Sequence, residues 1–382
     1  MSNIVHFGKY YFPEAGGIES VTSSLAKGAV KLGHQVTVVC FKKKDTVNTA
    51  EIIDQVRVVR APIKKIIASQ PLGFGYLKLC LKEGRKADIV HLHAPNMLAA
   101  LCCLLIGQKP RLLVHWHSDV IGKGLLGRIL KPLETALLKR ADWIVATSQI
   151  YADASPALKP FLSKVSVVPI GVADPQLLND NDSVIECLPI DIVNKLKNKR
   201  LILAVGRLVP YKGFNVLIEA AKFLNDDIIV MIVGIGPLQD FLHTMVERHG
   251  VAERVYLTGR LSDDVLHALF NRADLYCMPS VERSEAFGVV LLEAMAYGLP
   301  IIATNIPGSG VPWVNQHDVS GINVAVGNAT ALANACNEIL LSEDKYLRLS
   351  KGSRQRFVNE FTEDVSVKRM LDTYRHFFSE LN

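Results

Sequence analysis

The sequence has 382 residues, of which 49% are apolar and 21% charged, and its formal net charge is +6. A chain of this length exceeds the usual size of one domain, so we predict two domains, each large enough to bury its own core. The seven cysteines have no C-x2-C spacing, which predicts buried free thiols in a reducing compartment and excludes a disulfide framework or a cysteine zinc site. The longest apolar run, Met97 to Ile106, has ten residues, half of the roughly 20 that a membrane-spanning helix needs.

The amino terminus leads directly into an apolar strand at residues 4–7, without the basic stretch and long apolar core of a signal peptide. We therefore expect the protein to remain in the cytoplasm.

Short apolar runs alternate with helical stretches in both halves of the chain, which is the pattern of parallel sheets covered by helices. The fold class is therefore α/β, with two doubly wound sheets and a polar linker at 171–198. The expected strands are 4–7, 36–40, 56–59, 89–92, 112–115, 143–147 and 165–168, then 201–205, 228–233, 255–257, 275–278, 301–304 and 322–324.

A glycine pair, Gly16-Gly17, follows the first strand and leads into a helix. Paired glycines let backbone amides approach a ligand closely, although the same residues also suit a plain turn. The dinucleotide fingerprint G-x-G-x-x-G is absent.

Histidines stand at the ends of two predicted strands, as His91 and His93 and then His115 and His117. Ligands of a doubly wound fold bind at such strand ends, so His117 is a candidate site residue. Asp119 is a candidate either to orient the His117 ring or to bind an acceptor substrate. The pair His91 and His93, without further ligands, does not predict a metal site.

Charge is divided unevenly between the two halves. Residues 1–175 hold 23 basic and 12 acidic residues, a net +11, whereas residues 176–382 hold 20 and 25, a net −5. A basic first half indicates an anionic partner, and the leucines and basic residues that recur at helical spacing in 123–140 favour an acidic membrane surface. That segment is equally compatible with a helix packed on the sheet. We expect no nucleic-acid partner, because no binding motif or basic and aromatic interleaving is present.

In the second half, the strand at 201–205 runs into a glycine-bounded basic turn that contains Arg207 and Lys212. An arginine fork and a lysine ammonium together neutralise a diphosphate whose charge grows as it leaves.

Two carboxylates, Glu285 and Glu293, stand eight residues apart after the strand at 275–278. We expect Glu285 in the strand-to-helix turn and Glu293 about two turns into the helix. The free amides of Phe287, Gly288 and Val289 then form an anion site at the helix N-terminus.

These motifs, in this order, resemble the retaining glycosyltransferases of family 4, which have the two-domain GT-B fold. The resemblance spans nearly the whole chain and rests on Gly16-Gly17, His117, Arg207 with Lys212, and the E-x7-E element at Glu285 and Glu293. It implies two Rossmann-like domains that face each other across a cleft. They are an acceptor-binding domain at 1–175 and a nucleotide-sugar-binding domain at 176–360, and a helix at 361–382 crosses back to the first. Ala286 departs from the glycine that the family often has, which bears on the identity of the sugar.

The resemblance also implies the roles of individual residues. It places Glu285, His117, Arg207 and Lys212 in catalysis. The residues implied to bind the nucleotide sugar are Gly16, Gly17, Arg207, Lys212, Gly234, Arg260, Leu261, Glu285, Phe287, Gly288, Val289 and Glu293.

The implied reaction moves a sugar from a nucleoside diphosphate to an acceptor hydroxyl with retention, without a cofactor or a metal. Similarity of 279–288 and 307–312 to bacterial mannosyltransferases favours GDP-mannose as donor and an undecaprenyl diphosphate saccharide of lipopolysaccharide O-antigen as acceptor. The protein would then lie on the inner face of the plasma membrane. A UDP-sugar donor stays open, as does a nucleotide-sugar epimerase of similar fold; a non-catalytic scaffold is disfavoured because both acids are present.

Overall fold

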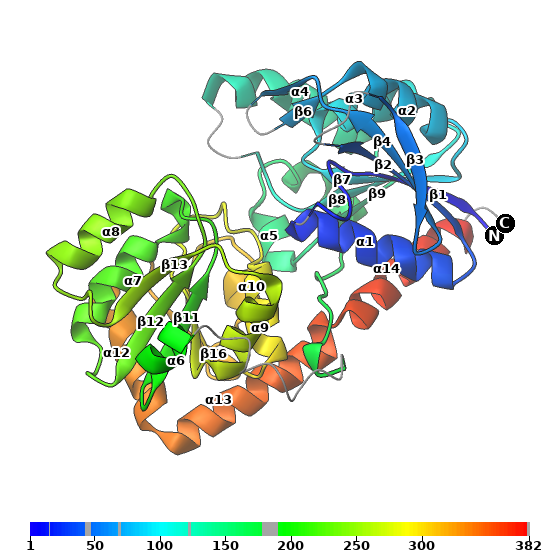
Figure 1. The fold of residues 1–382 in the computed structure, drawn as a ribbon. Coiled ribbons are helices and arrows are strands. Elements are labelled where there is room, and N and C mark those ends of the chain that lie inside the picture. Colours follow the sequence, from blue (N-terminus) through cyan, green and yellow to red (C-terminus); the bar gives the residue numbers. More distant parts are fainter. Residues whose placement is uncertain (15, 43–46, 68–69, 121–123, 178–189, 380–382) are drawn as a thin grey trace. The chain divides into compact units, whose positions relative to one another are not determined.

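Two compact units make up the chain in this computed structural model, which describes residues 1–382 except 15, 43–46, 68–69, 121–123, 178–189 and 380–382. The first unit comprises Met1–Val172 together with Glu363–Asn382, and the second comprises Ala173–Thr362 (Figure 1).

The first unit is built on an eight-stranded sheet in the order β10-β9-β8-β7-β1-β2-β4-β3. Neighbouring strands are parallel except β3 and β4, which pair antiparallel at the edge. The strands are β1 (Asn3–Phe7), β2 (Gln35–Lys42), β3 (Thr49–Ile53), β4 (Val56–Pro62), β7 (Ile89–Ala94), β8 (Arg111–Trp116), β9 (Trp143–Ala146) and β10 (Val165–Val167), with a separate hairpin of β5 (Lys65–Ile67) and β6 (Gln70–Leu72).

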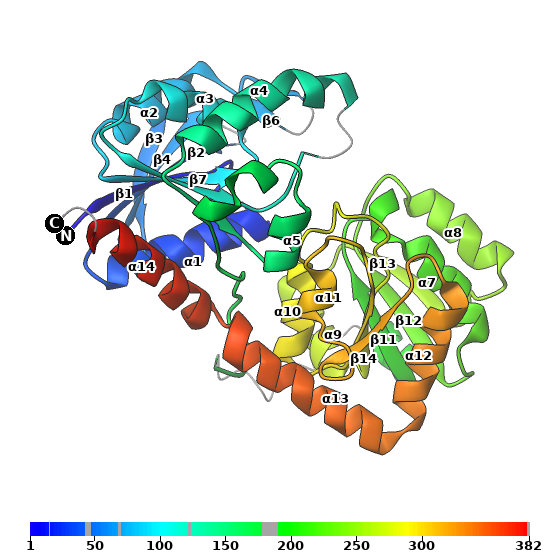
Figure 2. The same ribbon diagram turned by 180° about the vertical axis from the view of Figure 1, so that it is seen from behind.

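Helices cover both faces of this sheet, which is why a central strand such as β7 is buried along its whole length. Helices α1 and α14 pack side by side on one face, and α2, α3 and α4 lie on the other (Figures 1 and 2). The helices are α1 (Gly17–Lys31), α2 (Phe74–Gly84), α3 (Met97–Leu105), α4 (Gly124–Arg140), α5 (Gln149–Ala154) and α14 (Glu363–Ser379), with a 3-10 turn at Lys159–Lys164.

The second unit has a six-stranded, fully parallel sheet in the order β13-β12-β11-β14-β15-β16. Helices α7, α8 and α12 cover one face, and α9 and α10 the other (Figure 2). The strands are β11 (Arg200–Val205), β12 (Ile228–Val233), β13 (Val255–Gly259), β14 (Leu275–Met278), β15 (Ile301–Thr304) and β16 (Gly321–Val324). The helices are α6 (Ile190–Leu196), α7 (Phe214–Ala220), α8 (Gln239–Arg248), α9 (Asp263–Arg272), α10 (Val289–Ala296), α11 (Val311–Val314), α12 (Ala329–Leu341) and α13 (Glu343–Arg356); short turns lie at Pro175–Leu177, Pro210–Lys212, Ala221–Phe223 and Phe357–Phe361.

The predicted α/β class with two parallel sheets is confirmed, and all thirteen expected strands are present with ends shifted by a few residues. Strand β3 was not predicted, because most of its five residues are exposed and it has no clear apolar alternation. The linker prediction at 171–198 is wrong in part. Residues 190–196 form helix α6, and Asp174 is fixed to Arg354 of α13 by a bidentate ion pair of 2.7 and 2.9 Å. Residues 178–189 of that segment lie outside the described residues.

The apolar run after β7 forms helix α3, which buries Ala99, Ala100, Cys102 and Cys103. Six of the seven cysteines are buried and unpaired, as expected, and Cys187 lies outside the described residues. In the part of the chain that the structure describes, none of the helices combines the length and the apolar character needed to cross a membrane.

Candidate active site

The order of the strands in the second unit brings the predicted loops to one edge of the sheet. From β11 the chain moves outward through β12 and β13, and it then returns to the other side of β11 to add β14, β15 and β16. The carboxyl ends of β11 and β14 therefore lie at a topological switch point, where open α/β sheets bind ligands. The turn with Arg207 and Lys212 follows β11, and the turn with Glu285 follows β14.

A buried ion pair joins these two turns. The Nζ atom of Lys212 lies 2.6 Å from Oε2 of Glu285, and each side chain is only 10% exposed. The hydroxyl of Ser280 donates to the same carboxylate oxygen at 3.1 Å. Because both charges are largely removed from water, each depends on the other for its stabilisation.

Close backbone packing brings the lysine turn to the strand ends. Gly213, with φ of +66°, has no room for a side chain, because a Cβ atom there would lie 2.1 Å from the carbonyl oxygen of Pro279. Gly234, directly after β12, approaches Gly206 in the same way, and its Cβ would lie 1.9 Å from the Gly206 carbonyl oxygen. Only glycine permits these contacts, so both positions are required for the ends of β11, β12 and β14 to meet.

The turn that carries Glu285 is held in place by the last residue of β15 and by the loop that follows it. The hydroxyl of Thr304 donates to the carbonyl of Ser280, and that of Ser309 donates to the carbonyl of Glu285. The amide of Gly310 donates to the carbonyl of Ala286 at 2.8 Å. These bonds fix the backbone on both sides of the carboxylate, so its position does not depend on the ion pair alone.

Helix α10 begins at Val289 after Gly288, as the sequence predicted, and its first amides point out of the helix N-terminus. Phe287 packs its buried ring against Trp313 and Phe361, so only its backbone is available to a ligand. Glu293 is the fifth residue of α10 and therefore stands about one turn from its start, not two.

Glu293 is half-buried, and burial raises the pKa of its carboxyl to about 7; nearby Asp263 also raises this pKa, whereas Lys212 lowers it. Tyr276, fully buried on β14, has its pKa raised by burial and then by the charges of Glu293 and Glu285. Both acids and Lys212 thus share one region of the second unit. Sequence reasoning missed Tyr276 and Ser280, since a tyrosine inside a short apolar strand looks like an ordinary core residue.

The remaining predicted residues of this unit stand at the same edge of the sheet. Arg260 and Leu261 follow the end of β13, and Arg207 follows β11. Both arginines are exposed, and neither guanidinium has a hydrogen bond or ion pair with any residue that the structure describes. They are therefore free to bind an anion.

In the first unit, Gly16 and Gly17 stand exposed at the N-terminus of α1, on the loop that follows β1. A fully buried arginine, Arg60 of β4, anchors this loop by donating to the carbonyls of Tyr11 and Phe12, and it also pairs with Glu51 at 2.6 Å. Arg60 is one of two arginines in β4, with Arg57, and the sequence prediction did not use it.

His117 follows the end of β8 and is 6% exposed. Its Nε2 atom lies 3.0 Å from Nδ1 of His93, and its Nδ1 atom has no partner among the described residues. Asp119 accepts hydrogen bonds from Trp116 and Ser155, and the hydrogen-bond partner of the His117 ring is His93. The premise that His91 and His93 lack further imidazoles nearby is also wrong, because His6, His115 and His117 surround them.

Comparison with known proteins gives a consistent answer for both units. Residues 15–174 match the family described as Glycosyltransferase Family 4, and residues 190–356 match that described as Glycosyl transferases group 1. The O-antigen chain mannosyltransferase C of Escherichia coli is 30% identical over 379 residues, which cover 99% of this chain and 98% of that protein. The D-rhamnosyltransferase WbpZ of Pseudomonas aeruginosa is 29% identical over 94% of this chain and 92% of its own length.

A third relative, the GDP-mannose-dependent alpha-(1-6)-phosphatidylinositol monomannoside mannosyltransferase of Mycobacterium tuberculosis, is 25% identical and covers 98% of each chain. Among solved structures, Anabaena HepE in complex with UDP superposes with a TM-score of 0.78 over 98% of this chain and all of that one, at 19% identity.

Two doubly wound units with this topology, and relatives of this kind along the whole chain, define a glycosyltransferase with the GT-B fold. The chain belongs to glycosyltransferase family 4, which confirms the resemblance inferred from its motifs.

The buried pair of Lys212 and Glu285 predicts strong energetic coupling between the two side chains. Lys212→Met and Glu285→Gln each leave one charge without its partner, so each single variant should lose about 3 to 5 kcal/mol of unfolding free energy. The double variant should be more stable than the sum of the single effects predicts. Urea unfolding of the four proteins measures this coupling, and strictly additive losses would show that the pair does not interact.

Glu293 predicts a specific dependence of stability on pH. Its folded-state pKa of about 7 lies above the ordinary value of 4.5, so the native state holds the proton more tightly than the unfolded state does. The resulting stabilisation is complete below pH 4.5 and is lost as the pH rises through 7. The melting temperature of Glu293→Gln relative to wild type should therefore increase between pH 5 and pH 8. Parallel profiles for the two proteins would contradict this prediction, and the exposed Glu247→Gln serves as control.

Proposed function

We propose that this protein transfers mannose from GDP-mannose, with retention of configuration, to a hydroxyl of a lipid-linked saccharide in the synthesis of lipopolysaccharide O-antigen or a related polysaccharide. The names of two relatives support the sugar, an O-antigen chain mannosyltransferase and a GDP-mannose-dependent mannosyltransferase. The undecaprenyl diphosphate carrier is proposed from the resemblance alone.

The observation that carries this proposal is the Lys212–Glu285 ion pair at the switch point of the second unit. It places an ammonium, which suits the donor's diphosphate, against a carboxylate, which suits the hydroxyls of the donor sugar. The amides of Phe287, Gly288 and Val289 bind the diphosphate at the start of α10. Glu293 accepts hydrogen bonds from the ribose hydroxyls, and Gly234, Arg260 and Leu261 contact the base and ribose.

In the proposed reaction, the bond between the anomeric carbon and the diphosphate oxygen breaks while a bond to the acceptor oxygen forms on the same face of the sugar. The acceptor hydroxyl gives its proton to the leaving phosphate oxygen. Arg207 and Lys212 stabilise the negative charge that develops on the diphosphate, and they do so without a coordinated metal ion. Glu285 holds the sugar hydroxyls as positive charge develops at the anomeric carbon, and Gly16, Gly17 and His117 bind the sugar and diphosphate side of the donor.

Two other donors have their own support. A D-rhamnosyl donor is favoured by the relative WbpZ, and a UDP-sugar is compatible with the same loops. A nucleotide-sugar epimerase of similar fold would convert the donor in the absence of any acceptor, so incubation without acceptor separates the two reactions.

For the acceptor, we propose that the basic first unit lies on the inner face of the plasma membrane. The hairpin strand β5 exposes Ile66 and Ile67 next to Lys64 and Lys65. Helix α4 has both of the properties that its sequence allowed, a part that packs inside the unit and a part that exposes apolar and basic side chains. Its C-terminal half buries Leu137 and Leu138 and the helix packs against α3, whereas its first half exposes Arg128, Ile129 and Lys131. Exposed apolar side chains beside cations are typical of surfaces that bind anionic lipids.

This surface predicts binding to vesicles that contain anionic lipid. Replacement of Ile66 and Ile67 by Ser together with Lys64 and Lys65 by Gln should reduce cosedimentation with such vesicles severalfold, because both the apolar and the electrostatic contributions are lost. Neutral vesicles should bind weakly. Equal binding of the variant and the wild type would contradict the assignment of this surface.

The donor is tested by thermal denaturation with GDP, UDP, ADP and their sugars, since a ligand that binds the native state raises its stability. We expect the largest rise in melting temperature with GDP and GDP-mannose. In an activity assay we expect transfer of mannose to a lipid-linked saccharide, with an α-configured product. A larger rise in melting temperature with UDP than with GDP would contradict the proposed donor. The absence of a rise with every member of the panel would contradict it as well.

Arg207→Ala provides the matched variant for this experiment. Its guanidinium is exposed and unpartnered within the described part of the chain, so the unliganded melting temperature should be unchanged, while turnover falls by about 100-fold or more. The exposed Arg248→Ala on α8 should change neither quantity.

A further inference from the structure

Five histidines lie together inside the first unit, although they come from three different strands. His6 is on β1, His91 and His93 are on β7, and His115 and His117 are at the end of β8. All are buried, with exposures between 0% and 6%. They share one face of the sheet, where Tyr374 of α14 contacts Nδ1 of His91 at 2.6 Å. So many imidazoles in a core are costly, because a buried polar atom without a partner loses the hydrogen bonds that water would supply.

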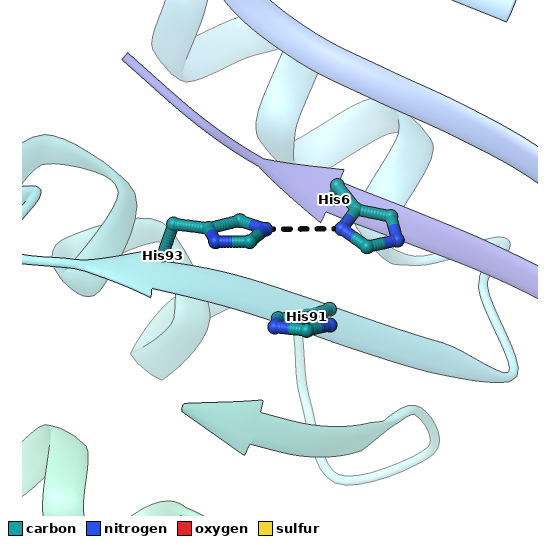
Figure 3. A group of neighbouring side chains, drawn as sticks. All are labelled: His6, His91 and His93. Carbon is teal, nitrogen blue, oxygen red and sulfur yellow. Dashed lines mark hydrogen bonds between the residues drawn. The ribbon is translucent and has the colours of Figure 1, made fainter. Parts of the chain in front are cut away.

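Three of the rings form a hydrogen-bonded row. Nδ1 of His6 lies 3.1 Å from Nε2 of His93, and Nδ1 of His93 lies 3.0 Å from Nε2 of His117. The planes differ by only 21° and 13°, and the ring centres are 5.4 and 5.3 Å apart, so the rings lie end to end in nearly one plane. Figure 3 shows the first of these contacts, with His91 beside it on the same strand as His93. His91 and His115 stack on this row, and they are not links in it.

The end-to-end geometry favours hydrogen bonds over a metal ion. Two imidazole nitrogens bound to one tetrahedral zinc ion lie about 3.3 Å apart, and both point at the ion and not at each other. The bonded nitrogens of the row point at each other along the line that joins the ring centres. His91 and His93 stack with planes only 10° apart, so their in-plane lone pairs run parallel and do not converge on one point.

Each ring of the row is neutral at physiological pH. Burial lowers the pKa of His6 and of His117 to about 3, with the charge of Lys9 lowering that of His117 further, and burial lowers the pKa of His93 as well. A neutral imidazole carries one N–H, so it donates through one nitrogen and accepts through the other. The row therefore has only two possible directions.

The unpartnered nitrogens at the two ends decide between these directions. Nε2 of His6 and Nδ1 of His117 are both buried without a hydrogen-bond partner in the described residues. If the row ran toward His6, an N–H would be trapped permanently at His6 Nε2. It would be a second orphaned buried donor beside that of His115, neither of whose nitrogens has a partner in the described residues, and each such donor is costly. If the row runs toward His117, the free N–H stands at His117, at the end of β8 where a doubly wound fold binds ligands.

We propose that His6 and His93 are positioning residues that hold His117 as its Nδ1–H tautomer. His6 donates from Nδ1 to His93, His93 donates from Nδ1 to His117, and His117 is left with a donor at Nδ1. This inference rests on the proposed function for the identity of the acceptor, a hydroxyl oxygen of the transferred sugar.

The direct test is nitrogen NMR of protein labelled with ¹⁵N-histidine, which distinguishes protonated from unprotonated ring nitrogens. Between pH 6 and pH 8, both His93 and His117 should be protonated at Nδ1 and unprotonated at Nε2. A proton on Nε2 of His117 in the wild-type protein overturns the proposal, and this measurement requires neither a variant nor a substrate.

Variants then test whether His6 controls the tautomer of His117 through His93. In His6→Phe a phenyl ring replaces the imidazole and the donor to His93 is lost, so His117 should populate both tautomers. We expect kcat/KM to fall about tenfold, the lower end of the loss seen when a partner that orients a metal-bound histidine is removed. His6→Asn, whose amide can replace the Nδ1–H donor, should restore most of the Nδ1–H tautomer of His117 and most of kcat/KM. His115→Phe is the matched control, because His115 stacks on His117 at 4.1 Å without a hydrogen bond, and it should leave the His117 tautomer and turnover unchanged.

The outcomes separate this inference from the proposed function. If no sugar nucleotide is used but the spectra show the expected tautomers and the His6→Phe response, the glycosyl transfer proposal fails and the histidine row stands. If mannose is transferred and a folded His6→Phe keeps the wild-type tautomer of His117, the row fails and the function stands. A stoichiometric transition metal in the purified protein, whose removal by a chelator shifts these ring signals, also overturns the row.

Discussion

The buried ion pair between Lys212 and Glu285 is the interaction on which the candidate site depends. Neither charge is stable alone at this depth, because water is largely excluded from both. The pair exists only because two turns from strands that are neighbours in the sheet, but far apart in sequence, approach within backbone contact. Gly213 permits that approach, and Ser280, Thr304 and Ser309 hold the acidic turn in place. The same two groups then offer complementary charges to a diphosphate and to sugar hydroxyls.

The histidine row in the first unit follows a different physical logic. Here no charge is present, because burial keeps the rings neutral, and the useful property is the direction of the N–H groups. A neutral histidine can present either a donor or an acceptor to a ligand, and its protein partner decides which one. In both units, therefore, a group proposed to contact a ligand is fixed by a buried polar partner that comes from another strand or turn.

Much of this arrangement was readable in the sequence. The apolar runs predicted the strands, and the glycine, basic and acidic residues that follow them marked the carboxyl edge of the second sheet. The prediction that Glu293 lies two turns into its helix was wrong by one turn, since the helix starts only at Val289. Residues with core-like patterns were missed. Tyr276 resembles an ordinary strand residue, and Arg60 was passed over although it is the charge that anchors the glycine loop.

The sequence alone determined the fold class, the family and which loops bear the chemistry, because periodicity and short motifs are local properties of the chain. Only the tertiary structure decided which of those groups touch. Lys212 meets Glu285 across 73 positions of sequence, and His6 meets His93 across 87, because parallel strands place distant residues side by side in register. The contact with Glu285 stabilises the charge of Lys212, and the contact with His93 determines, in our proposal, which nitrogen of His117 carries the proton. The sequence pattern within one segment carries no information about a partner that lies on another strand.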